Sequence, residues 1–372
     1  MLRRIFLSLG GLLLVAVVAL SISLSYTSDC PAPSSVAAGE NTMMAVQRPC
    51  YGSADVLQYT RVAIPTPADD QVLIKVESAS VNPLDYHFMR GTPYILRLMA
   101  GIGQPDEIAI GRDFAGTVVA TGSEVTALAV GDRVFGGTNG AFAEYTVRGS
   151  TGSIARIPDG VSFAQAAGIP VAGLTALQAL RDHGQLKPGQ RVLINGASGG
   201  VGTYAVQIAK SMGAHVTGVC SGRNVELVKS LGADQVFNYK EESYLDSGQR
   251  FDLIVDNVGN HSPMQNRAVL TEAGKLVIVG GEKGNWIAPF ITPMKASFGN
   301  LFVEQELKSF TASLRPEDLA TVAELMAAGE VRTVVDQNFP LADTASAIGH
   351  SESGRARGKI LVNTGPVAVP PG

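Results

Sequence analysis

One turn near the middle of the chain restricts the fold more than any other feature of the sequence. The apolar run RVLIN at residues 191–195 leads directly into GASGGVG at residues 196–202, and a helical pattern follows. Glycines in this setting let the backbone approach a pyrophosphate group and let the helix pack close to its strand. Ala197 takes the place of the first glycine of the usual G-x-G-x-x-G pattern and is small enough to fit there. We therefore expect a dinucleotide-binding turn formed by Gly199, Gly200, Val201 and Gly202.

The sequence around this turn alternates short apolar runs with helical patterns. We expect strands at residues 191–195, 215–220, 235–238, 251–256 and 274–279. We expect helices at residues 163–180, 202–212, 225–231 and 316–328. A β-α-β-α succession predicts a parallel, doubly wound sheet of the α/β class. The glycines that follow residues 212 and 231 fit the ends of two of these helices.

The sequence before residue 158 has a different pattern, with short β-rich runs separated by proline and glycine turns. We expect strands there at residues 45–47, 72–76, 116–120 and 131–135. This spacing predicts a small, mostly antiparallel β domain. Two late runs, at residues 331–335 and 359–362, are expected to return to it. The chain has 372 residues, which is long enough for two domains with separate cores.

The first 42 residues form a separate segment. Two leading arginines precede residues 5–24, which carry no charge and are about long enough to cross a bilayer core. Residues 28–42 are small, polar and proline-bearing, as is typical of a linker. An uncleaved membrane anchor is favoured, with a cleaved signal peptide and twin-arginine export as alternatives. A further alternative is a misread start, with a cytoplasmic protein translated from Met43 or Met44.

The net charge and the cysteine positions argue against a nucleic-acid partner and against a cysteine zinc site. The formal net charge is −4 with no basic run, so the sequence lacks the electrostatic pattern of a nucleic-acid-binding protein. Cys30, Cys50 and Cys220 lie far apart and match neither a zinc-ligand spacing nor an even disulfide framework. We interpret them as isolated thiols. A Cys30–Cys50 disulfide stays open for a protein that is exported to an oxidising compartment.

Cofactor preference is read at the end of the second strand of the parallel sheet. An acidic side chain there would hold the ribose 2′-hydroxyl of NAD, but the segment VCSGRN at residues 219–224 contains none. Ser221 can instead donate a hydrogen bond, and Arg223 a charge-assisted one, to a 2′-phosphate. We therefore predict NADPH as the cofactor. The alternative is that Arg223 is only a solvated surface charge on the next helix.

Several motifs stand in an order that resembles one enzyme superfamily. They are SVNPLD (80–85), GRDFAG (111–116), GDRV (131–134), PVAGLTA (170–176), the glycine turn, NY (238–239) and GRARGK (354–359). From Met44 to Val362 the chain is similar to the quinone oxidoreductase branch of the medium-chain dehydrogenase/reductase superfamily. The resemblance implies a GroES-like catalytic domain that is split around a Rossmann NADP-binding domain. The expected segments are a signal or anchor (1–27), a linker (28–42), the GroES-like domain (43–164), the Rossmann domain (165–328), a return to the GroES-like domain (329–365) and a tail (366–372).

The same resemblance bears on metal and catalysis. Where zinc-dependent members hold a Cys, a His and a second Cys, this chain has Asn82, Arg112 and Val171. None of these can replace the zinc ligands, so we predict no metal. Asn82 is expected to face the nicotinamide and to hydrogen-bond the substrate or the ribose, unless it is only a turn residue before a proline. His87 is expected to donate a proton or to polarise a carbonyl, unless it is a surface histidine.

The remaining expectations concern the cofactor, the substrate and the activity. The resemblance implies that Tyr239 and Arg355 contact the cofactor and that residues 92–104 and 282–298 line the substrate cleft. The predicted activity is hydride transfer from NADPH to a quinone, an enone or a related electrophilic carbonyl compound without zinc. The alternative is a non-catalytic NADP-binding adaptor or sensor at a membrane. Relatives are commonly dimers, so a homodimer is also expected.

Overall fold

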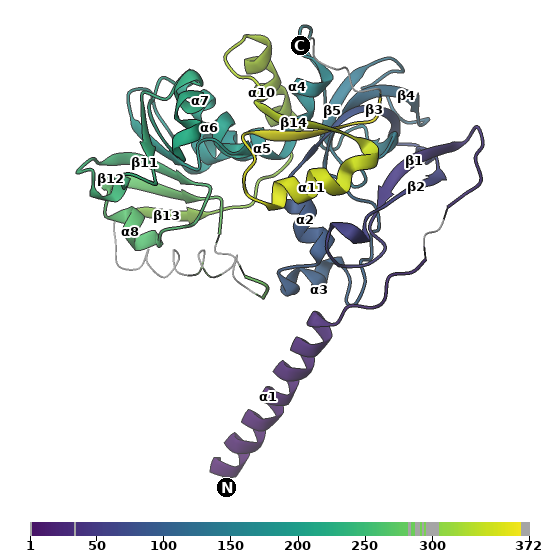
Figure 1. The fold of residues 1–372 in the computed structure, drawn as a ribbon, viewed down its shortest axis with the longest axis horizontal. Coiled ribbons are helices and arrows are strands. Elements are labelled where there is room, and N and C mark those ends of the chain that lie inside the picture. The colour runs from purple at the N-terminus through teal and green to yellow at the C-terminus, as the bar shows by residue number, and fades with distance from the viewer. Residues whose placement is uncertain are drawn as a thin grey trace.

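The structure is a computed structural model that describes residues 2–32, 35–281, 284–286, 291, 294 and 305–365, with side chains from residue 14 onward. The body contains a six-stranded and a seven-stranded sheet, each with an apolar core, and helices pack between and around them (Figure 1). The predicted fold class, a parallel doubly wound sheet together with a mostly antiparallel β domain, is confirmed.

Six strands form the parallel sheet, in the order β10-β9-β8-β11-β12-β13. They are β8 (Arg191–Asn195), β9 (His215–Cys220), β10 (Gln235–Asn238), β11 (Phe251–Asp256), β12 (Leu270–Ile278) and β13 (Glu306–Ser309). The central strands β8 and β11 are buried almost throughout, which explains their continuous apolar runs. The prediction lacks β13, because a four-residue strand holding Glu306 and Lys308 has no apolar run.

The helices of this domain follow the predicted pattern except that one expected helix is divided and α8 was not predicted. They are α4 (Phe163–Ala167), α5 (Pro170–Gln178), α6 (Gly200–Ser211), α7 (Val225–Ser230), α8 (Pro263–Arg267) and α10 (Pro316–Ala327). The predicted glycine caps are confirmed, since Gly213 and Gly232 have φ angles of 78° and 106°. The single helix predicted over residues 163–180 is wrong, because α4 ends at Ala167 and Pro170, which has no N–H to continue the helical hydrogen bonds, begins α5.

The second sheet contains strands from both ends of the chain. Its order is β14-β15-β3-β4-β5-β7, and β6 pairs with β3. The strands are β3 (Gln71–Val81), β4 (Asp113–Thr121), β5 (Arg133–Gly137), β6 (Tyr145–Gly149), β7 (Ile154–Arg156), β14 (Val335–Pro340) and β15 (Lys359–Asn363). The strand predicted at residues 331–335 is wrong, since β14 begins only at Val335. Val331 and Val334 are buried in the larger core, so their apolar spacing reflects burial outside a strand.

Shorter elements surround this second sheet. Strands β1 (Thr42–Gln47) and β2 (Gln58–Ala63) form an antiparallel ribbon. Helices α2 (Pro83–Arg90), α3 (Arg97–Ala100) and α11 (Thr344–Glu352) lie on the side of the molecule from which the N-terminal helix projects (Figure 1).

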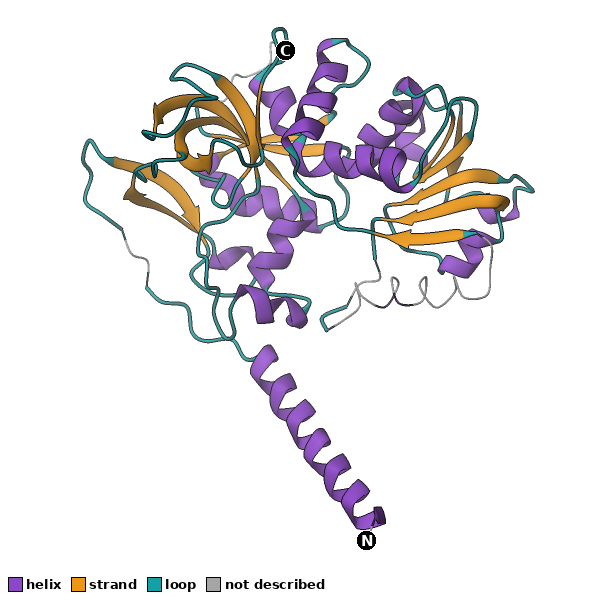
Figure 2. Cartoon of the chain, turned by 180° about the vertical axis from the view of Figure 1, so that it is seen from behind, coloured by secondary structure: helices purple, strands orange, loops and turns teal. Residues whose placement is uncertain are grey.

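The N-terminal residues form α1 (Leu2–Ser25), which extends away from the body (Figure 2). Among the residues that the structure describes, no helix is both long enough and apolar enough to span a membrane. Cys30 and Cys50 are joined in a disulfide with their Cα atoms 5.1 Å apart. The interpretation of all three cysteines as isolated thiols is therefore wrong for this pair, whereas Cys220 is a free, buried thiol.

Candidate cofactor and active site

The glycine turn connects the carboxyl end of β8 to the start of α6. A Cβ atom at Gly202 would lie 2.1 Å from the carbonyl oxygen of Gly196, so only glycine allows the helix to pack this closely. At Gly199 a Cβ atom would meet only that same oxygen, at 3.5 Å, so the outer side of the turn is open. The first N–H groups of α6 point out of the helix here, as a phosphate site requires.

Two asparagine side chains at this end of the sheet each have a buried oxygen without a hydrogen-bond partner. Asn224 follows β9 and Asn257 follows β11, and the Oδ1 atom of each is buried without a hydrogen-bond donor. Their amide groups are engaged, because Asn224 donates to the Ser198 hydroxyl (2.9 Å) and Asn257 donates to the Asn195 carbonyl (2.9 Å). A buried acceptor left unpaired costs about 1–3 kcal/mol. Donors such as the ribose hydroxyls of a dinucleotide would satisfy both atoms, so these residues fit that ligand.

The residues predicted to select the cofactor lie around the ends of β9 and β10. Arg223 and Arg355 are exposed, and the Arg223 guanidinium donates to the Arg355 carbonyl oxygen (2.8 Å). The Ser221 hydroxyl accepts from the Asn224 amide (3.3 Å). Tyr239 is largely exposed, and its N–H donates to the carbonyl of the residue that precedes Ser221. Three separate loops therefore bring these predicted side chains to one edge of the sheet.

Asn82 lies in a buried polar cluster at the junction of the two domains. The Lys359 ammonium group donates to Asn82 Oδ1 (2.6 Å), to the Val81 carbonyl (3.2 Å) and towards Asp113 Oδ2 (3.5 Å). Asp113 also accepts from the Ser80 hydroxyl (2.9 Å). Asn82 and Lys359 are each only 2 % exposed. The Asn82 amide therefore does not present a free polar surface in this structure.

The same cluster touches the glycine turn. Gly358 donates its N–H to the Ser198 carbonyl (3.0 Å), and the next residue is Lys359. A Cβ atom at Gly200 would lie 3.4 Å from the Lys359 side-chain carbon Cδ. One lysine side chain thus runs from the predicted pyrophosphate turn to Asn82.

Burial determines the protonation behaviour of this cluster. Desolvation raises the pKa of Asp113, and the Lys359 ammonium offsets only part of that shift. Desolvation likewise lowers the pKa of Lys359. Burial raises the pKa of Asp85 to about 7, although the backbone N–H of Asn82 donates to this carboxyl group (2.7 Å) and opposes the shift. Through this bond Asp85 orients the backbone at the start of α2.

His87 lies on α2 and is partly buried. Its Nδ1 atom donates to the Thr92 carbonyl oxygen (2.9 Å), which leaves Nε2 as an acceptor in the neutral ring. Burial lowers the pKa of His87, and the bond to Thr92 offsets part of that change. Neutral His87 therefore has no proton to give at Nε2. Donation from that atom requires the imidazolium form.

The residues at the expected zinc-ligand positions do not form a metal site. The Val171 backbone N–H donates to Asp113 (3.2 Å), whereas the Arg112 side chain bonds Asn139 and lies over the Phe88 ring. Among the described residues, no three His, Cys, Asp or Glu side chains come together in a way that could hold a metal ion.

Sequence reasoning missed the roles of Lys359 and Asp113, although both stand in motifs that mark the resemblance. A charged side chain gives no sign in the sequence that it will be buried. The proposed lining at residues 282–298 lies outside the described residues except for 284–286, 291 and 294.

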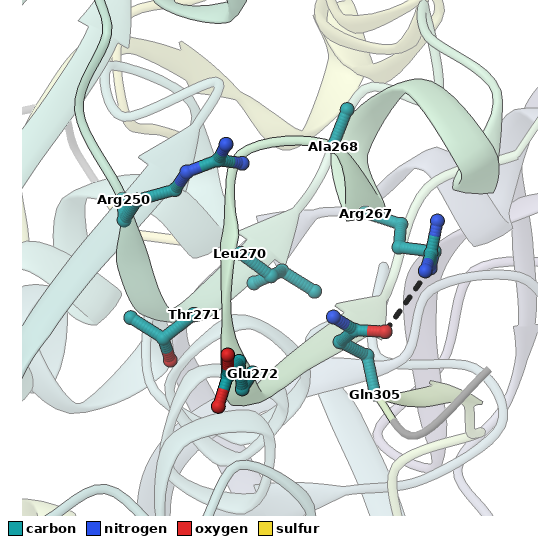
Figure 3. Close-up of a pocket in the computed structure, with 7 residues that line it drawn as sticks. All are labelled: Arg250, Arg267, Ala268, Leu270, Thr271, Glu272 and Gln305. Carbon is teal, nitrogen blue, oxygen red and sulfur yellow. Dashed lines mark hydrogen bonds between the residues drawn. The ribbon is translucent and has the colours of Figure 1, made fainter.

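A surface cavity of about 480 Å³ lies elsewhere, at the amino ends of β11 and β12 (Figure 3). Arg250, Arg267, Glu272 and Gln305 contribute to its wall, and Arg267 donates to Gln305 (3.0 Å). Ligands of open α/β sheets bind at the carboxyl ends of the strands, so this cavity is on the wrong side for the dinucleotide.

Comparisons with known proteins agree with this arrangement. Residues 68–159 match the family model of the alcohol dehydrogenase GroES-like domain, and residues 231–362 match that of the zinc-binding dehydrogenases. A chloroplastic quinone-oxidoreductase homologue of Spinacia oleracea is 36% identical over 338 residues, covering 86% of this chain and 98% of the relative. A trans-enoyl reductase of Aspergillus terreus is 37% identical, covering 79% of this chain and 86% of the relative.

A solved structure shows the same fold over nearly the whole body. The quinone oxidoreductase of Coxiella burnetii superposes with a TM-score of 0.77 at 31% identity, covering 87% of this chain and all of that one. The chain therefore belongs to the medium-chain dehydrogenase/reductase superfamily, as a member of the quinone oxidoreductase type, and is an NAD(P)H-dependent oxidoreductase.

Proposed function

We propose that this chain uses NADPH to reduce a quinone, an enone or a related electrophilic carbonyl compound, without zinc. The observation that best supports a reaction without zinc is the buried cluster at the expected metal position. There Asn82 Oδ1 and Asp113 already accept hydrogen bonds from an ammonium group and a backbone N–H. Neither the Val171 side chain nor a guanidinium is a zinc ligand. An electrophile that is reduced without a Lewis acid fits this site better than an alcohol.

The preference for NADPH rests on charge at the end of β9. Arg223 and Arg355 lie together there, and no acidic side chain follows β9 in positions 221–224. A 2′-phosphate would meet positive charge, whereas a 2′-hydroxyl would find no carboxylate to accept its hydrogen bond. When bound, NADPH would supply the hydride. The residues of the chain would hold it at the glycine turn and keep water away from the buried cluster.

The groups around the electrophile have distinct roles in this proposal. Lys359 fixes the Asn82 amide, because its ammonium group selects Oδ1 as the atom that faces it. His87 holds the chain at Thr92 and supplies a proton only when it is protonated. In neutral solution the proton that completes reduction then comes from water.

The experiment is a substrate panel with metal-analysed full-length protein, in which NADPH oxidation is followed spectroscopically. Quinones and enones should be reduced, and saturated ketones of similar size should not. NADPH should give a lower KM than NADH. Turnover of a simple alcohol with NADP⁺ at a rate comparable to the best quinone would contradict the proposal.

We also propose that residues 1–27 attach the enzyme to a membrane or lead it across one. Residues 5–24 carry no charge, and the Cys30–Cys50 disulfide favours an oxidising compartment. The relatives' names place them in organelles, chloroplasts for the spinach protein and mitochondria for a Bos taurus oxidoreductase of 32% identity. Cell fractionation checks this: the chain should sediment with membranes, and recovery of full-length protein only in the soluble fraction would refute it.

A further inference from the structure

The segment that follows α1 is built into the catalytic domain through one buried arginine. The Arg97 guanidinium, 2 % exposed, donates to the Tyr26 carbonyl (2.6 Å) and to the Thr27 hydroxyl (3.1 Å). The same group donates to the carbonyls of Gly91 (2.8 Å) and Arg90 (3.3 Å) at the carboxyl end of α2. Arg97 therefore joins the N-terminal extension to the helix that carries the candidate catalytic histidine.

A second set of contacts holds the extension at a neighbouring point. The Ser28 N–H donates to the Gly103 carbonyl (2.9 Å), and its hydroxyl reaches the same oxygen (3.1 Å). Two residues later, Cys30 is bonded to Cys50. The residue after Cys50 is Tyr51, whose ring lies under the Arg97 guanidinium at 4.4 Å. Part of the predicted linker is thus fixed to the body by covalent and hydrogen bonds.

Residues 92–94, just before Arg97, contact both α2 and the other domain. His87 donates to the Thr92 carbonyl, and the Thr92 N–H donates back to the His87 carbonyl (3.1 Å). The Tyr94 N–H then donates to the backbone carbonyl of Asn285 in the other domain (2.6 Å), and the Tyr94 ring contacts the Trp286 ring edge-on, with the ring centroids 4.9 Å apart. We call residues 92–103 the substrate loop and residues 24–30 the brace.

We propose that Arg97 is a positioning residue for the electrophile site and that the brace holds it in place. The inference rests on the proposed function, because it assigns the substrate loop and His87 to the electrophile. The brace holds Arg97 and Gly103 of the substrate loop while His87 holds Thr92 at its start, so the shape of the loop depends on the brace. The glycine turn receives no contact from the brace among the described residues, so cofactor binding should not depend on it.

The test compares two proline substitutions in the full-length chain, purified in detergent. Ser28→Pro removes both bonds to Gly103, because proline has neither the N–H nor the hydroxyl group. Ala38→Pro is the matched control, since Ala38 is exposed in the same segment and has no hydrogen bond. Ser28→Pro should raise KM for the electrophile about tenfold, with kcat and the Kd for NADPH changed less than about twofold. The control should match the parent protein.

A second readout does not require turnover. Hydrogen exchange of the backbone amides in residues 92–103 should become faster in Ser28→Pro and stay unchanged in Ala38→Pro. Equal KM values and equal exchange in the two variants would overturn the proposal, as would an equal loss of NADPH affinity. If Ser28→Pro does not fold, Cys30→Ser replaces it, with the same expectations. If the parent protein reduces no electrophile in the panel, the proposed function fails. The hydrogen-exchange comparison alone then shows whether the brace holds the substrate loop.

Discussion

At the scale of single residues, Arg223 carries the claim about cofactor choice. Arg223→Ala removes a charged donor from the proposed 2′-phosphate, a loss of roughly 1.5–3 kcal/mol. The Kd for NADPH should therefore rise about 10-fold or more, while the Kd for NADH stays unchanged. Fluorescence titration measures both. Arg250→Ala is the matched control, because Arg250 is an exposed arginine at the opposite end of the sheet. Equal affinities of the native protein for the two cofactors would show that the assignment is mistaken.

His87 gives a prediction in pH. Since burial lowers its pKa below the ordinary value, the proton-donating imidazolium becomes populated only in acid. As pH rises through that lowered pKa, the His87-dependent part of kcat/KM should be lost. His87→Asn keeps an N–H near Thr92 but has no acid, so its profile should lack the acidic rise, which can reach about 10²-fold. Identical pH profiles of the two proteins, corrected for the acid decay of NADPH, would exclude His87 as the proton donor.

Residue identity alone could not locate the most constrained polar group of the site. The sequence offers Asn82 as a candidate because it stands where relatives hold a metal ligand, but its partner Lys359 is 277 residues away. The pair forms because β15 lies beside β3, with Ile360 opposite Val81. Only the fold brings their ends together.

At the scale of elements, hydrophobic periodicity predicted the bounds of several strands of the parallel sheet. Strands β8, β9, β10 and β11 have the predicted bounds. The interior strands β8, β9 and β11 are buried over most of their length and are therefore largely apolar. Hydrophobic periodicity failed where buried residues lie outside a strand, and where a strand contains few buried residues. Val331 and Val334 are core residues outside any strand, and β13 is a strand without an apolar run.

The glycine turn is a part of the site that the sequence alone could predict. Its predicted form depends on local sterics, and the near contact between Gly202 and Gly196 is of that kind. The unpartnered oxygens of Asn224 and Asn257 depend instead on which hydrogen-bond donors the folded loops after β9 and β11 bring near them. No pattern in the sequence indicates that these two oxygens lack a hydrogen-bond donor.

At the scale of the whole molecule, each of the two large sheets and its surrounding helices provides a different part of the proposed site. The parallel sheet offers an open glycine turn and unpartnered acceptors, and the second sheet offers the buried cluster, His87 and the substrate loop. Lys359 lies between them, since it follows Gly358, whose N–H donates to Ser198 of the glycine turn, and its ammonium group donates to Asn82. Cofactor binding and the electrophile site should therefore be mechanically linked through one side chain.

The central claim is that this pairing of domains reduces an electrophile without a metal. The direct measurement is kcat/KM for a quinone with NADPH, taken before and after the protein is treated with a strong chelator and its zinc content is determined. The account predicts the same value in both states, with far less than one zinc per chain. One zinc per chain that survives dialysis, together with loss of quinone reduction on chelation and its return on adding zinc, would contradict it.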